Sequence, residues 1–483
     1  MAQYFKKVFV ANRGEIACRA IRALRELGIP AVVGYSDCDR LSLAVRMADE
    51  AYRLGPSPAS LSYLDGGRIV QMARDTGCDA LFPGYGFLAE NADFADACGA
   101  AGITFVGPSG DVIRKMGDKA EARRTLAAAG LPVTPGIEDV DGPEDIRAFA
   151  EEVGYPVLIK PVAGGGGKGM FRIDEPGEIV ESLATSRSVA AKAFGSDRVY
   201  VEKLIIDPCH IEFQFLADKH GNALHLGERE CSVQRNHQKL LEEAPSTKLT
   251  AEQRAEMGAK VAKAMSDIGY ITAGTMEFLY EAPTQNLYVM EVNTRIQVEH
   301  TVTEMVIGVD IIRKMIRAAA GYELGLTQED ITFVGHAIQC RINAEDPKQG
   351  FAPSFGKITG LRQAVGQFIR NDSGVYNGWE VPSHYDSLLA KICTVGRHRT
   401  LAIERMKRAL DEFLIEGIKT TVPLHRAIMD HPEFVDCSFN TGFIDKHLDG
   451  LLEYEEGEGI YDVTRVAALV AEITALGHNP HCE

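Results

Sequence analysis

The first 117 residues alternate short apolar runs with amphipathic stretches, and this alternation constrains the fold more than any other feature of the chain. Residues 7–12 are typical of a buried strand, and residues 13–28 are typical of an amphipathic helix that ends at a glycine. Further β-rich runs lie at 31–36, 80–86 and 103–107, with helical stretches between them. Strands that alternate with helices form parallel sheets, so we predict an α/β fold that begins with a doubly wound parallel sheet.

Composition excludes several classes of protein. The chain has 483 residues, 45% hydrophobic and 25% charged, as in a soluble globular protein of two to four domains. A net charge of -17 argues against binding to nucleic acid or to acidic membranes. The ten cysteines form no CxxC pair, which is typical of reduced structural thiols. The start has no hydrophobic signal core and no apolar run is long enough to span a bilayer, so we expect a cytoplasmic protein.

The chain divides into four blocks. The predicted parallel sheet occupies residues 1–117, and its first turn, ANRGEIA, lacks the GxGxxG of nicotinamide-dependent enzymes. Residues 118–330 combine strands with a glycine-rich loop, and the part near 133–203 that carries this loop is the expected lid. Residues 331–448 form an α+β block that we expect to finish with a helix near 400–414. Residues 449–483 open acidic and then have the pattern of a helical appendage.

A glycine loop follows the strand that ends at Lys160. Consecutive glycines allow backbone N–H groups to approach a phosphate closely, and a nearby lysine supplies the opposite charge. The loop is not a P-loop, because Gly169 follows Lys168 where Ser or Thr is required and Val162 replaces the first glycine. A flexible loop is the alternative. The loop residues are Gly164, Gly165, Gly166 and Gly167.

Two strands carry a pair of carboxylates. TMEFLY and NLYVMEVN are joined by a turn, so antiparallel pairing brings Glu277 nearly opposite Glu291. Period-2 alternation predicts that Val289 and Asn293 share the face of Glu291. Facing carboxylates repel unless a cation lies between them, and Mg²⁺ prefers such oxygens together with substrate phosphates. Two solvated surface acids are the alternative.

The run after the second of these strands alternates polar side chains that suit a small oxyanion. Arg295 can hold such an anion through two N–H groups, Gln297 adds an amide, and Glu299 can accept its proton. A salt-bridged surface segment is the alternative. The same alternative applies to GERECSVQRNHQKLLEEAP, in which Gln234, His237 and Lys239 lie among charged residues.

Together these stretches resemble the biotin carboxylase family of the ATP-grasp superfamily, from about residue 7 to residue 448. The matching stretches are FVANRGEIA, PGYGFLAENADFA, FVGPS, MGDKA, GGGGKGM, ECSVQRNHQK, EEAP, GTMEF, NTRIQVEH, CRINAED and VPSHYDS. The resemblance implies a pre-ATP-grasp domain, an ATP-grasp domain with a mobile lid, and a C-terminal α+β biotin carboxylase domain. It also implies ATP, Mg²⁺ or Mn²⁺, and bicarbonate as ligands, with biotin supplied by a carrier protein.

The resemblance assigns roles to individual positions. For ATP it implies Lys119, Lys160, the four loop glycines, Met170, Glu202, Lys203, Leu204, His210, Gln234, His237 and Leu279. For the metal it implies Glu277, Glu291 and Asn293. Bicarbonate would be held by Lys239, Arg295, Gln297 and the backbone of Val298, with Glu299 as its base. Arg370 resembles the arginine that stabilises the biotin enolate, and Tyr85 would lie near the ureido ring.

Some features depart from the family or are missing. Phe82 stands where His is usual, and Thr301 stands where Pro usually follows Glu-His. No Glu-Ala-Met-Lys-Met biotinylation segment is present, so we expect a separate biotin carboxyl carrier protein, separate carboxyltransferase subunits, and a homodimer by resemblance. The acyl acceptor stays open among acetyl-CoA, propionyl-CoA, pyruvate and other 2-oxoacids. Two alternatives remain: an ATP-grasp ligase with another acceptor, and a non-catalytic nucleotide-binding scaffold subunit.

Overall fold

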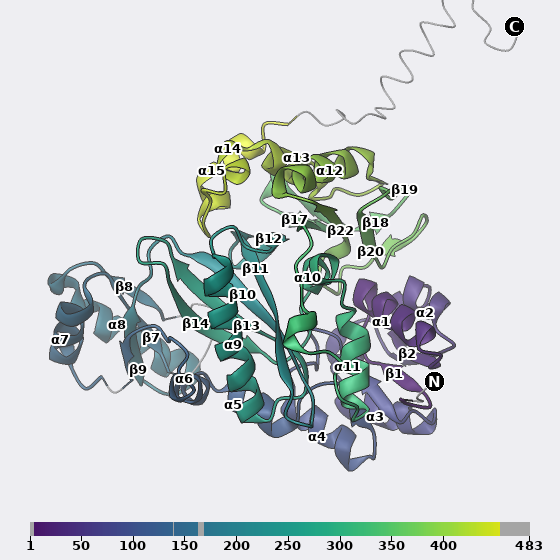
Figure 1. Cartoon of the computed structure of the whole chain (residues 1–483), viewed down its shortest axis with the longest axis horizontal. Coiled ribbons are helices and arrows are strands. Elements are labelled where there is room, and N and C mark those ends of the chain that lie inside the picture. Colours follow the sequence, from purple (N-terminus) through teal and green to yellow (C-terminus); the bar gives the residue numbers. More distant parts are fainter. Residues whose placement is uncertain (1–3, 139, 163–168, 455–483) are drawn as a thin grey trace, which may run out of the picture.

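The N-terminal sheet has the doubly wound topology that the sequence predicts. The computed structural model describes residues 4–138, 140–162 and 169–454. Five parallel strands lie in the order β3-β2-β1-β4-β5, so the order reverses between β1 and β4. This N-terminal part of the chain, in purple, lies to one side of the molecule (Figure 1). The strands are β1 (Val8–Val10), β2 (Ala31–Ser36), β3 (Glu50–Gly55), β4 (Ala80–Phe82) and β5 (Thr104–Phe105). The helices are α1 (Gly14–Glu26), α2 (Leu43–Met47), α3 (Gly66–Asp75), α4 (Ala92–Ala100) and α5 (Gly110–Gly117). Ligand sites in such sheets lie at the point of reversal.

A second, antiparallel sheet forms the centre of the molecule. Its eight strands lie in the order β14-β13-β10-β11-β12-β15-β22-β20. They are β10 (Cys209–Ala217), β11 (Ala223–Arg235), β12 (Gln238–Ala244), β13 (Thr272–Glu281), β14 (Asn286–Asn293), β15 (His336–Asn343), β20 (Ile369–Ser373) and β22 (Leu388–Gly396). The helices that pack against it include α9 (Ala251–Ile268), α10 (His300–Ile307), α11 (Ile311–Ala319) and α12 (Arg399–Glu412). Because β12 pairs with β15, one continuous sheet joins the second and third sequence blocks.

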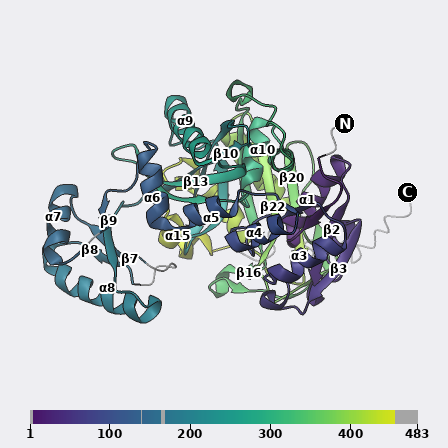
Figure 2. The same cartoon turned by 90° about the horizontal axis from the view of Figure 1, so that it is seen from below.

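A third sheet stands to one side of the central one and has a core of its own. Its four strands lie in the antiparallel order β6-β9-β7-β8, and the unit projects away from the rest of the chain (Figure 2). The elements are β6 (Gly136–Ile137), α7 (Pro143–Val153), β7 (Val157–Pro161), β8 (Phe171–Ile173), α8 (Ile179–Phe194) and β9 (Val199–Lys203). Helix α6 (Lys119–Ala128) leads into it. Side chains such as Ile146, Ile159 and Val201 fill its separate core.

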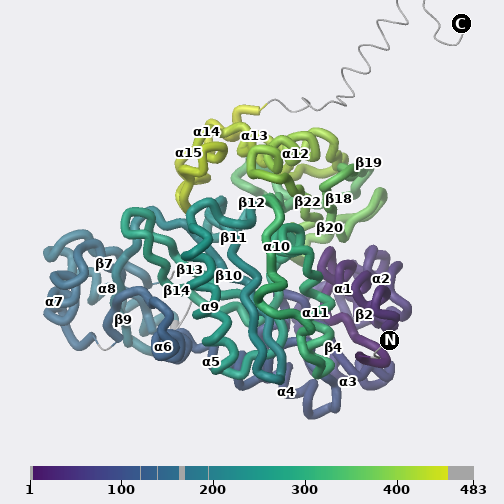
Figure 3. Tube along the Cα trace, in the orientation of Figure 1, coloured from purple at the N-terminus to yellow at the C-terminus, as the bar shows by residue number. Residues whose placement is uncertain are grey.

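The C-terminal block ends differently from the prediction. Helix α12 is present, but three short helices follow it and cap one end of the central sheet, as the chain trace shows (Figure 3). These are α13 (Val422–Asp430), α14 (Pro432–Val435) and α15 (Phe443–Leu451). They form because Phe434, Phe439 and Phe443 are buried together. Short strand pairs β16 (Glu345–Asp346) with β17 (Ala352–Pro353), β18 (Gly356–Lys357) with β21 (Glu380–Val381), and β19 (Gly360–Arg362) with β23 (Leu414–Glu416) complete the block. Of the predicted appendage, residues 455–483 lie outside the described residues.

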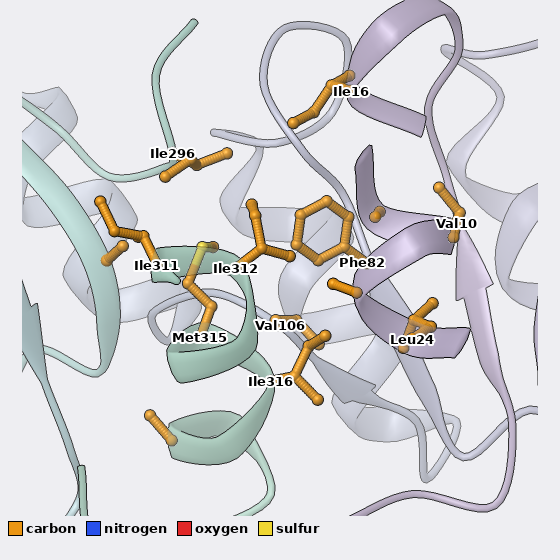
Figure 4. Close-up of a cluster of buried hydrophobic side chains, with 14 of the residues drawn as sticks. Val10, Ile16, Leu24, Phe82, Val106, Ile296, Ile311, Ile312, Met315 and Ile316 are labelled. Carbon is orange, nitrogen blue, oxygen red and sulfur yellow. The ribbon is translucent and has the colours of Figure 1, made fainter. Parts of the chain in front are cut away.

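The largest core cluster joins the N-terminal sheet to the central part of the chain. Ile312 and Ile316 of α11 lie beside Phe82 and Val106 (Figure 4). Phe82, one of the departures from the family pattern, is fully buried in this cluster and therefore has a packing role. No helix in the described part of the chain combines the length and apolar character that crossing a bilayer requires.

Candidate active site

A cleft of about 1300 Å³ lies where the three sheets meet. The turn after β1 lines it with Asn12 and Arg13, and the turn after β4 adds Tyr85, so the cleft opens at the reversal point of the parallel sheet. The predicted residues that line it are Tyr85, Lys160, Met170, Leu204, His210, Gln234, His237, Lys239, Glu277, Leu279, Glu291, Asn293, Arg295, Gln297, Val298 and Glu299. Residues far apart in the sequence are therefore brought to one cavity.

Glu277 and Glu291 face each other across β13 and β14, as the strand pattern predicts. The prediction for Val289 is wrong. A β-bulge inserts Met290 between the paired positions, and the extra residue turns Val289 into the apolar core, 8% exposed, while Met290 and Glu291 face the cleft. Simple period-2 counting fails at this position because a bulge shifts the alternation by one residue.

The Glu277 carboxylate lies in a dense polar environment. Its Oε1 accepts hydrogen bonds from Lys239 Nζ at 3.0 Å, Asn293 Nδ2 at 2.9 Å and Gln297 Nε2 at 2.6 Å. Its Oε2 lies 3.1 Å from His210 Nε2. Burial opposes ionisation of Glu277, but Lys239 and His210 outweigh it and hold its pKa well below the ordinary value.

The pKa of Glu291 is shifted in the opposite direction to that of Glu277. Its side chain is open to the cleft, yet desolvation by the surrounding protein raises its pKa, and the facing Glu277 carboxylate raises it further. The nearby charge of Lys119 works against this shift. No hydrogen bond or ion pair to Glu291 forms within the described residues, so this carboxylate is available to an added cation. Two carboxylates beside the Asn293 amide are a donor set that fits Mg²⁺.

Two cationic side chains contact Glu299. Its Oε1 accepts from Lys239 Nζ at 2.6 Å and its Oε2 accepts from Arg341 Nη2 at 2.9 Å. Burial alone would raise the pKa of Glu299, but Lys239, Arg341 and Arg229 hold it well below the ordinary value. Glu299 is therefore ionised and fixed by two cations at the floor of the cleft.

Arg295 lies at the edge of the same group. Its Nε donates to Glu90 Oε2 at 2.8 Å and its Nη2 donates to Asn293 Oδ1 at 2.8 Å. The buried Ile296 anchors the chain between Arg295 and Gln297, which both line the cleft. The alternating run after β14 thus converges on one cavity, and its arginine can hold an oxyanion beside Lys239.

The hairpin of β11 and β12 delivers Gln234 and His237. Asn236 and His237 form its two-residue turn, with positive φ angles of 50° and 62°. Turns of this kind join tightly paired antiparallel strands, and here the turn brings His237 to the cleft. Gln234 pairs with Lys239 across the hairpin, which explains their odd spacing in the sequence.

The comparisons with known proteins agree with this architecture. Family models described as "Biotin carboxylase, N-terminal domain", "Carbamoyl-phosphate synthase L chain, ATP binding domain" and "Biotin carboxylase C-terminal domain" match residues 4–113, 118–327 and 339–446. "Biotin carboxylase 1" of Bacillus subtilis is 52% identical over 443 residues, covering 92% of this chain and 98% of the relative. This chain belongs to the biotin carboxylase family.

Two further biotin carboxylase relatives come from larger carboxylases. A pyruvate carboxylase subunit of Methanothermobacter thermautotrophicus is 50% identical over 448 residues, covering 92% of this chain and 91% of the relative. The crystal structure of the biotin carboxylase domain dimer of Hydrogenobacter thermophilus 2-oxoglutarate carboxylase, in complex with MgADP, ADP and bicarbonate, aligns with a TM-score of 0.87 at 49% identity, covering 94% of this chain and 100% of that one. Biotin carboxylases are ATP-dependent ligases, so the chain is an enzyme of that class.

Some predicted residues of this biotin carboxylase do not line the cleft. They are Lys119, Glu202, Lys203 and Arg370. Glu202 forms an ion pair with Lys160, which does line the cleft, and Lys203 Nζ lies 3.3 Å from Glu281 Oε1. Arg370 donates to Glu304 Oε2 at 2.7 Å and to both carboxylate oxygens of Asp372. The four loop glycines, Gly164, Gly165, Gly166 and Gly167, lie outside the described residues.

Sequence reasoning missed several charged residues that organise the biotin carboxylase site. Arg229 is completely buried and donates to Glu212 Oε1 at 2.5 Å and to Gln297 Oε1 at 3.1 Å, and Glu212 Oε2 in turn accepts from Lys239 Nζ at 2.5 Å. The signal was present: Glu212 is a charged residue inside the apolar strand HIEFQFLAD, and such a residue requires a buried partner. Arg341 and Glu90, in CRINAED and FLAEN, gave no comparable signal.

Proposed function

We propose that the chain uses ATP and bicarbonate to carboxylate biotin carried by a separate protein, and that carboxyphosphate is the intermediate. One observation carries this proposal: the Lys239 ammonium contacts both Glu277, the candidate metal ligand, and Glu299, the candidate base. Lys239 therefore links Glu277, which would hold the metal of the nucleotide, to the pocket around Glu299 that would hold bicarbonate. The substrates of the first step would therefore meet at Lys239.

In the first step, a bicarbonate oxygen attacks the γ-phosphorus of ATP, the bond to the β-phosphate oxygen breaks, and the bicarbonate proton moves to Glu299. Lys239 and Arg295 hold the bicarbonate oxygens. With its lowered pKa, Glu299 is a weak base in the resting site. The proton therefore transfers as the oxygen attacks phosphorus, when loss of electron density from that oxygen increases its acidity. Mg²⁺ held by Glu277 and Glu291 would offset charge on the phosphoryl oxygens.

In the second step, the carbon–oxygen bond of carboxyphosphate breaks to give CO₂ and phosphate. Phosphate removes the proton from the ureido nitrogen of biotin, and that nitrogen forms a bond with CO₂. Tyr85 lines the cleft near the turn after β4, and we propose that it lies beside the ureido ring. Arg370 would hold the developing negative charge on the ureido oxygen, which requires a reorganisation of its pairs with Glu304 and Asp372.

ATP would lie between the central sheet and the unit of β6 to β9. Lys160 and Met170 of that unit line the cleft, as do Leu204, His210 and Leu279. Its separate core permits it to move as a rigid body, so we propose residues 133–203 as a lid that excludes water from the reactive intermediate. We propose domains 1–117, 118–330 and 331–448 and an appendage 449–483; the matched family ranges support the first three.

The test is bicarbonate-dependent ATP cleavage by the purified chain, measured with and without free biotin. We expect phosphate release that requires bicarbonate and increases with biotin. Glu299→Gln should abolish this release while nucleotide binding, measured by calorimetry, persists. Equal loss of cleavage and binding would contradict the role of Glu299, and release without a response to biotin would favour an ATP-grasp ligase with another acceptor.

We propose that carrier and carboxyltransferase partners complete the enzyme in the cytoplasm, and that the chain is a homodimer. Relatives named for pyruvate and 2-oxoglutarate carboxylases support a multi-subunit assembly, and a structural relative is a dimer. The acceptor, an acyl-CoA such as acetyl- or propionyl-CoA or a 2-oxoacid such as pyruvate, would be selected by the partner. Co-purification followed by carboxylation assays with each acceptor tests this, and size-exclusion chromatography tests the dimer.

A further inference from the structure

The segment that joins α14 to α15, residues 436–442, forms part of the wall of the cleft. The two helices lie together at the top of the molecule (Figure 1), and Thr441 and Gly442 between them line the cleft. The backbone N–H of Thr441 donates to the Pro208 carbonyl at 3.0 Å. Pro208 itself lines the cleft, two residues before His210. The position of this segment therefore affects the space in which we place ATP.

Two side chains outside the segment also bind its backbone. Cys209 Sγ donates to the Phe439 carbonyl at 3.6 Å. Lys248 Nζ donates to the Cys437 carbonyl and lies 5.3 Å from the centre of the Phe439 ring. Cys437 has a φ angle of 61°, a left-handed conformation that residues with a side chain rarely adopt, so the turn depends on the contacts that hold it. A charged donor such as Lys248 contributes more to such a turn than a neutral one.

Lys248 also lies close to a buried carboxylate. Glu230 of β11 is 1% exposed and accepts hydrogen bonds from the hydroxyls of Ser232 and Ser246, the second at 2.8 Å. The Ser246 hydroxyl in turn accepts from the backbone N–H of Lys248 at 3.1 Å. One hydroxyl group therefore separates the backbone of Lys248 from the Glu230 carboxylate. A lysine side chain is long and flexible enough to turn from the Cys437 carbonyl to that carboxylate.

The surroundings of Glu230 decide when it carries a charge. Within the described residues Glu230 has no ion-pair partner, whereas Glu243, directly opposite it across β11 and β12, is paired with Arg399 and His336. Burial raises the pKa of Glu230 to about 7, and the neighbouring Glu243 carboxylate adds to the rise. Below that pH Glu230 is neutral and does not compete for Lys248. Above it, Glu230 is an anion that attracts the ammonium.

We propose that Lys248 is a positioning residue for the nucleotide, and that ionised Glu230 competes with the Cys437 carbonyl for the Lys248 ammonium. While Glu230 is neutral, Lys248 holds the 436–442 segment against the cleft and the nucleotide binds tightly. When Glu230 ionises, the ammonium turns toward it and the segment loses that contact. This role rests on the proposed position of ATP in the cleft. Nucleotide binding and protonation of Glu230 then favour each other, because both stabilise the same arrangement.

Calorimetric titration with MgADP at pH 6.5 and pH 8.5 tests the role of Lys248. The Kd of wild type should rise about fivefold between the two pH values, the loss expected for one hydrogen bond from a charged donor. Glu230→Gln should keep the wild-type value of pH 6.5 at both pH values. Lys248→Met should have a Kd about fivefold higher at both, and Lys248→Arg, which keeps a charged donor, should stay within about twofold of wild type at pH 6.5.

Comparison of wild type with Glu230→Gln at one pH removes the titration of other groups, which this variant leaves in place. The charged or titratable groups around Glu230 are Cys209, Tyr280, Glu243, Lys248, His336 and Arg399. Calorimetry at pH 7.5 in buffers of different ionisation enthalpy measures proton uptake directly. Wild type should take up about 0.4 of a proton more than Glu230→Gln when MgADP binds, which follows from a fivefold difference in affinity between the two protonation states.

Lys314 provides a matched control for Lys248. It is likewise half-buried, its Nζ donates to the Leu324 carbonyl at 2.8 Å, and it does not line the cleft. Lys314→Met should lower the melting temperature about as much as Lys248→Met does, yet leave the Kd for MgADP unchanged at both pH values. If Lys248→Met binds MgADP as wild type does at pH 6.5, Lys248 has no positioning role.

The remaining outcomes separate this role from the proposed function. A wild-type chain that does not bind MgADP would remove the proposed ATP site itself. Binding by wild type with the same pH dependence and proton uptake as Glu230→Gln would overturn only the competition for Lys248. Should Lys248→Met fold poorly, Glu230→Gln still tests the proposal, because glutamine has nearly the same volume as glutamate and keeps Lys248 in place.

Discussion

The ammonium of Lys239 lies 2.6 Å from Oε1 of Glu299, at the floor of the cleft. Both side chains are largely shielded from solvent, at 10% and 2% exposure. The same ammonium also reaches Glu212 and Glu277, so three carboxylates share this cation. Removal of a cation shared by buried carboxylates is strongly destabilising, because part of their charge is then left uncompensated.

Lys239→Met should therefore affect both stability and activity. Loss of the cation leaves part of the charge on three buried carboxylates uncompensated, and breaking a buried ion pair typically costs about 3–5 kcal/mol. The depressed pKa values of Glu277 and Glu299 give stability that is present above their ordinary pKa and is lost as the pH falls through the folded-state pKa. Without Lys239 both pKa values rise, so the variant should unfold at a higher pH during acid titration. Circular dichroism from pH 7 to 3 measures this, and an unchanged midpoint would contradict it.

Glu291→Gln should separate metal binding from stability. The raised pKa of Glu291 indicates that its charge is unfavourable without a cation, so the glutamine should raise the melting temperature of the metal-free protein at pH 8. The same change removes a metal ligand and should raise the Mg²⁺ concentration for half-maximal ATP cleavage by at least tenfold. Glu256→Gln, an exposed change on α9, is the control. A Mg²⁺ requirement equal to that of wild type would remove Glu291 from the metal site.

Arg370→Gln should distinguish the two half-reactions. Arg370 lies outside the cleft lining, so ATP cleavage that does not depend on biotin should stay within about twofold of wild type, whereas carboxylation of free biotin should be lost. Incorporation of labelled bicarbonate into biotin measures the rate of carboxylation. Carboxylation at the wild-type rate would refute the assignment of Arg370 to the biotin oxygen.

The fully buried Lys391 should support the backbone at Val298. Its Nζ donates to the Val298 carbonyl at 2.8 Å and lies 3.1 Å from Glu15 Oε1. Lys391→Met should raise the KM for bicarbonate and destabilise the protein by about 3–5 kcal/mol, because Glu15 loses its buried cation partner. Adding Glu15→Gln should recover part of the stability but not the KM. Urea unfolding of the two single variants and the double variant gives the coupling energy, and simple additivity would contradict the pairing.

Glu230→Gln should change stability in a pH-dependent way. Glu230 is buried, and burial raises its pKa to about 7 although Ser232 and Ser246 donate to it. A raised pKa gives stability that is complete below the ordinary value and is lost as the pH rises through about 7. The glutamine should therefore stabilise the protein at pH 8 relative to pH 5, by on the order of 2 kcal/mol. A difference in unfolding free energy between the two proteins that is the same at pH 5 and at pH 8 would show that the fold does not raise the pKa of Glu230.

Sequence patterns correctly predicted those parts of the fold and site that depend on residues close together in the chain. The turn between β13 and β14 and the period of the strands placed Glu277 opposite Glu291, and the strand–helix alternation gave the parallel sheet. The prediction of the strand face on which Val289 lies was wrong, because a β-bulge leaves no clear signal in a sequence. The contact between Arg341 and Glu299 depends on the pairing of β12 with β15, which joins strands far apart in the chain. No local pattern encodes that pairing.

The continuous central sheet also limits how the chain can be divided for experiments. A fragment that ends at residue 330 would leave β12 as an exposed edge, because its partner β15 begins at His336. Unpaired strand edges recruit other chains, so such a fragment should aggregate instead of retaining ATP-binding ability. Expression of the two sequence blocks as independent pieces is therefore a poor route to a functional half-enzyme, whereas removal of the unit from β6 to β9 cuts no strand of this sheet.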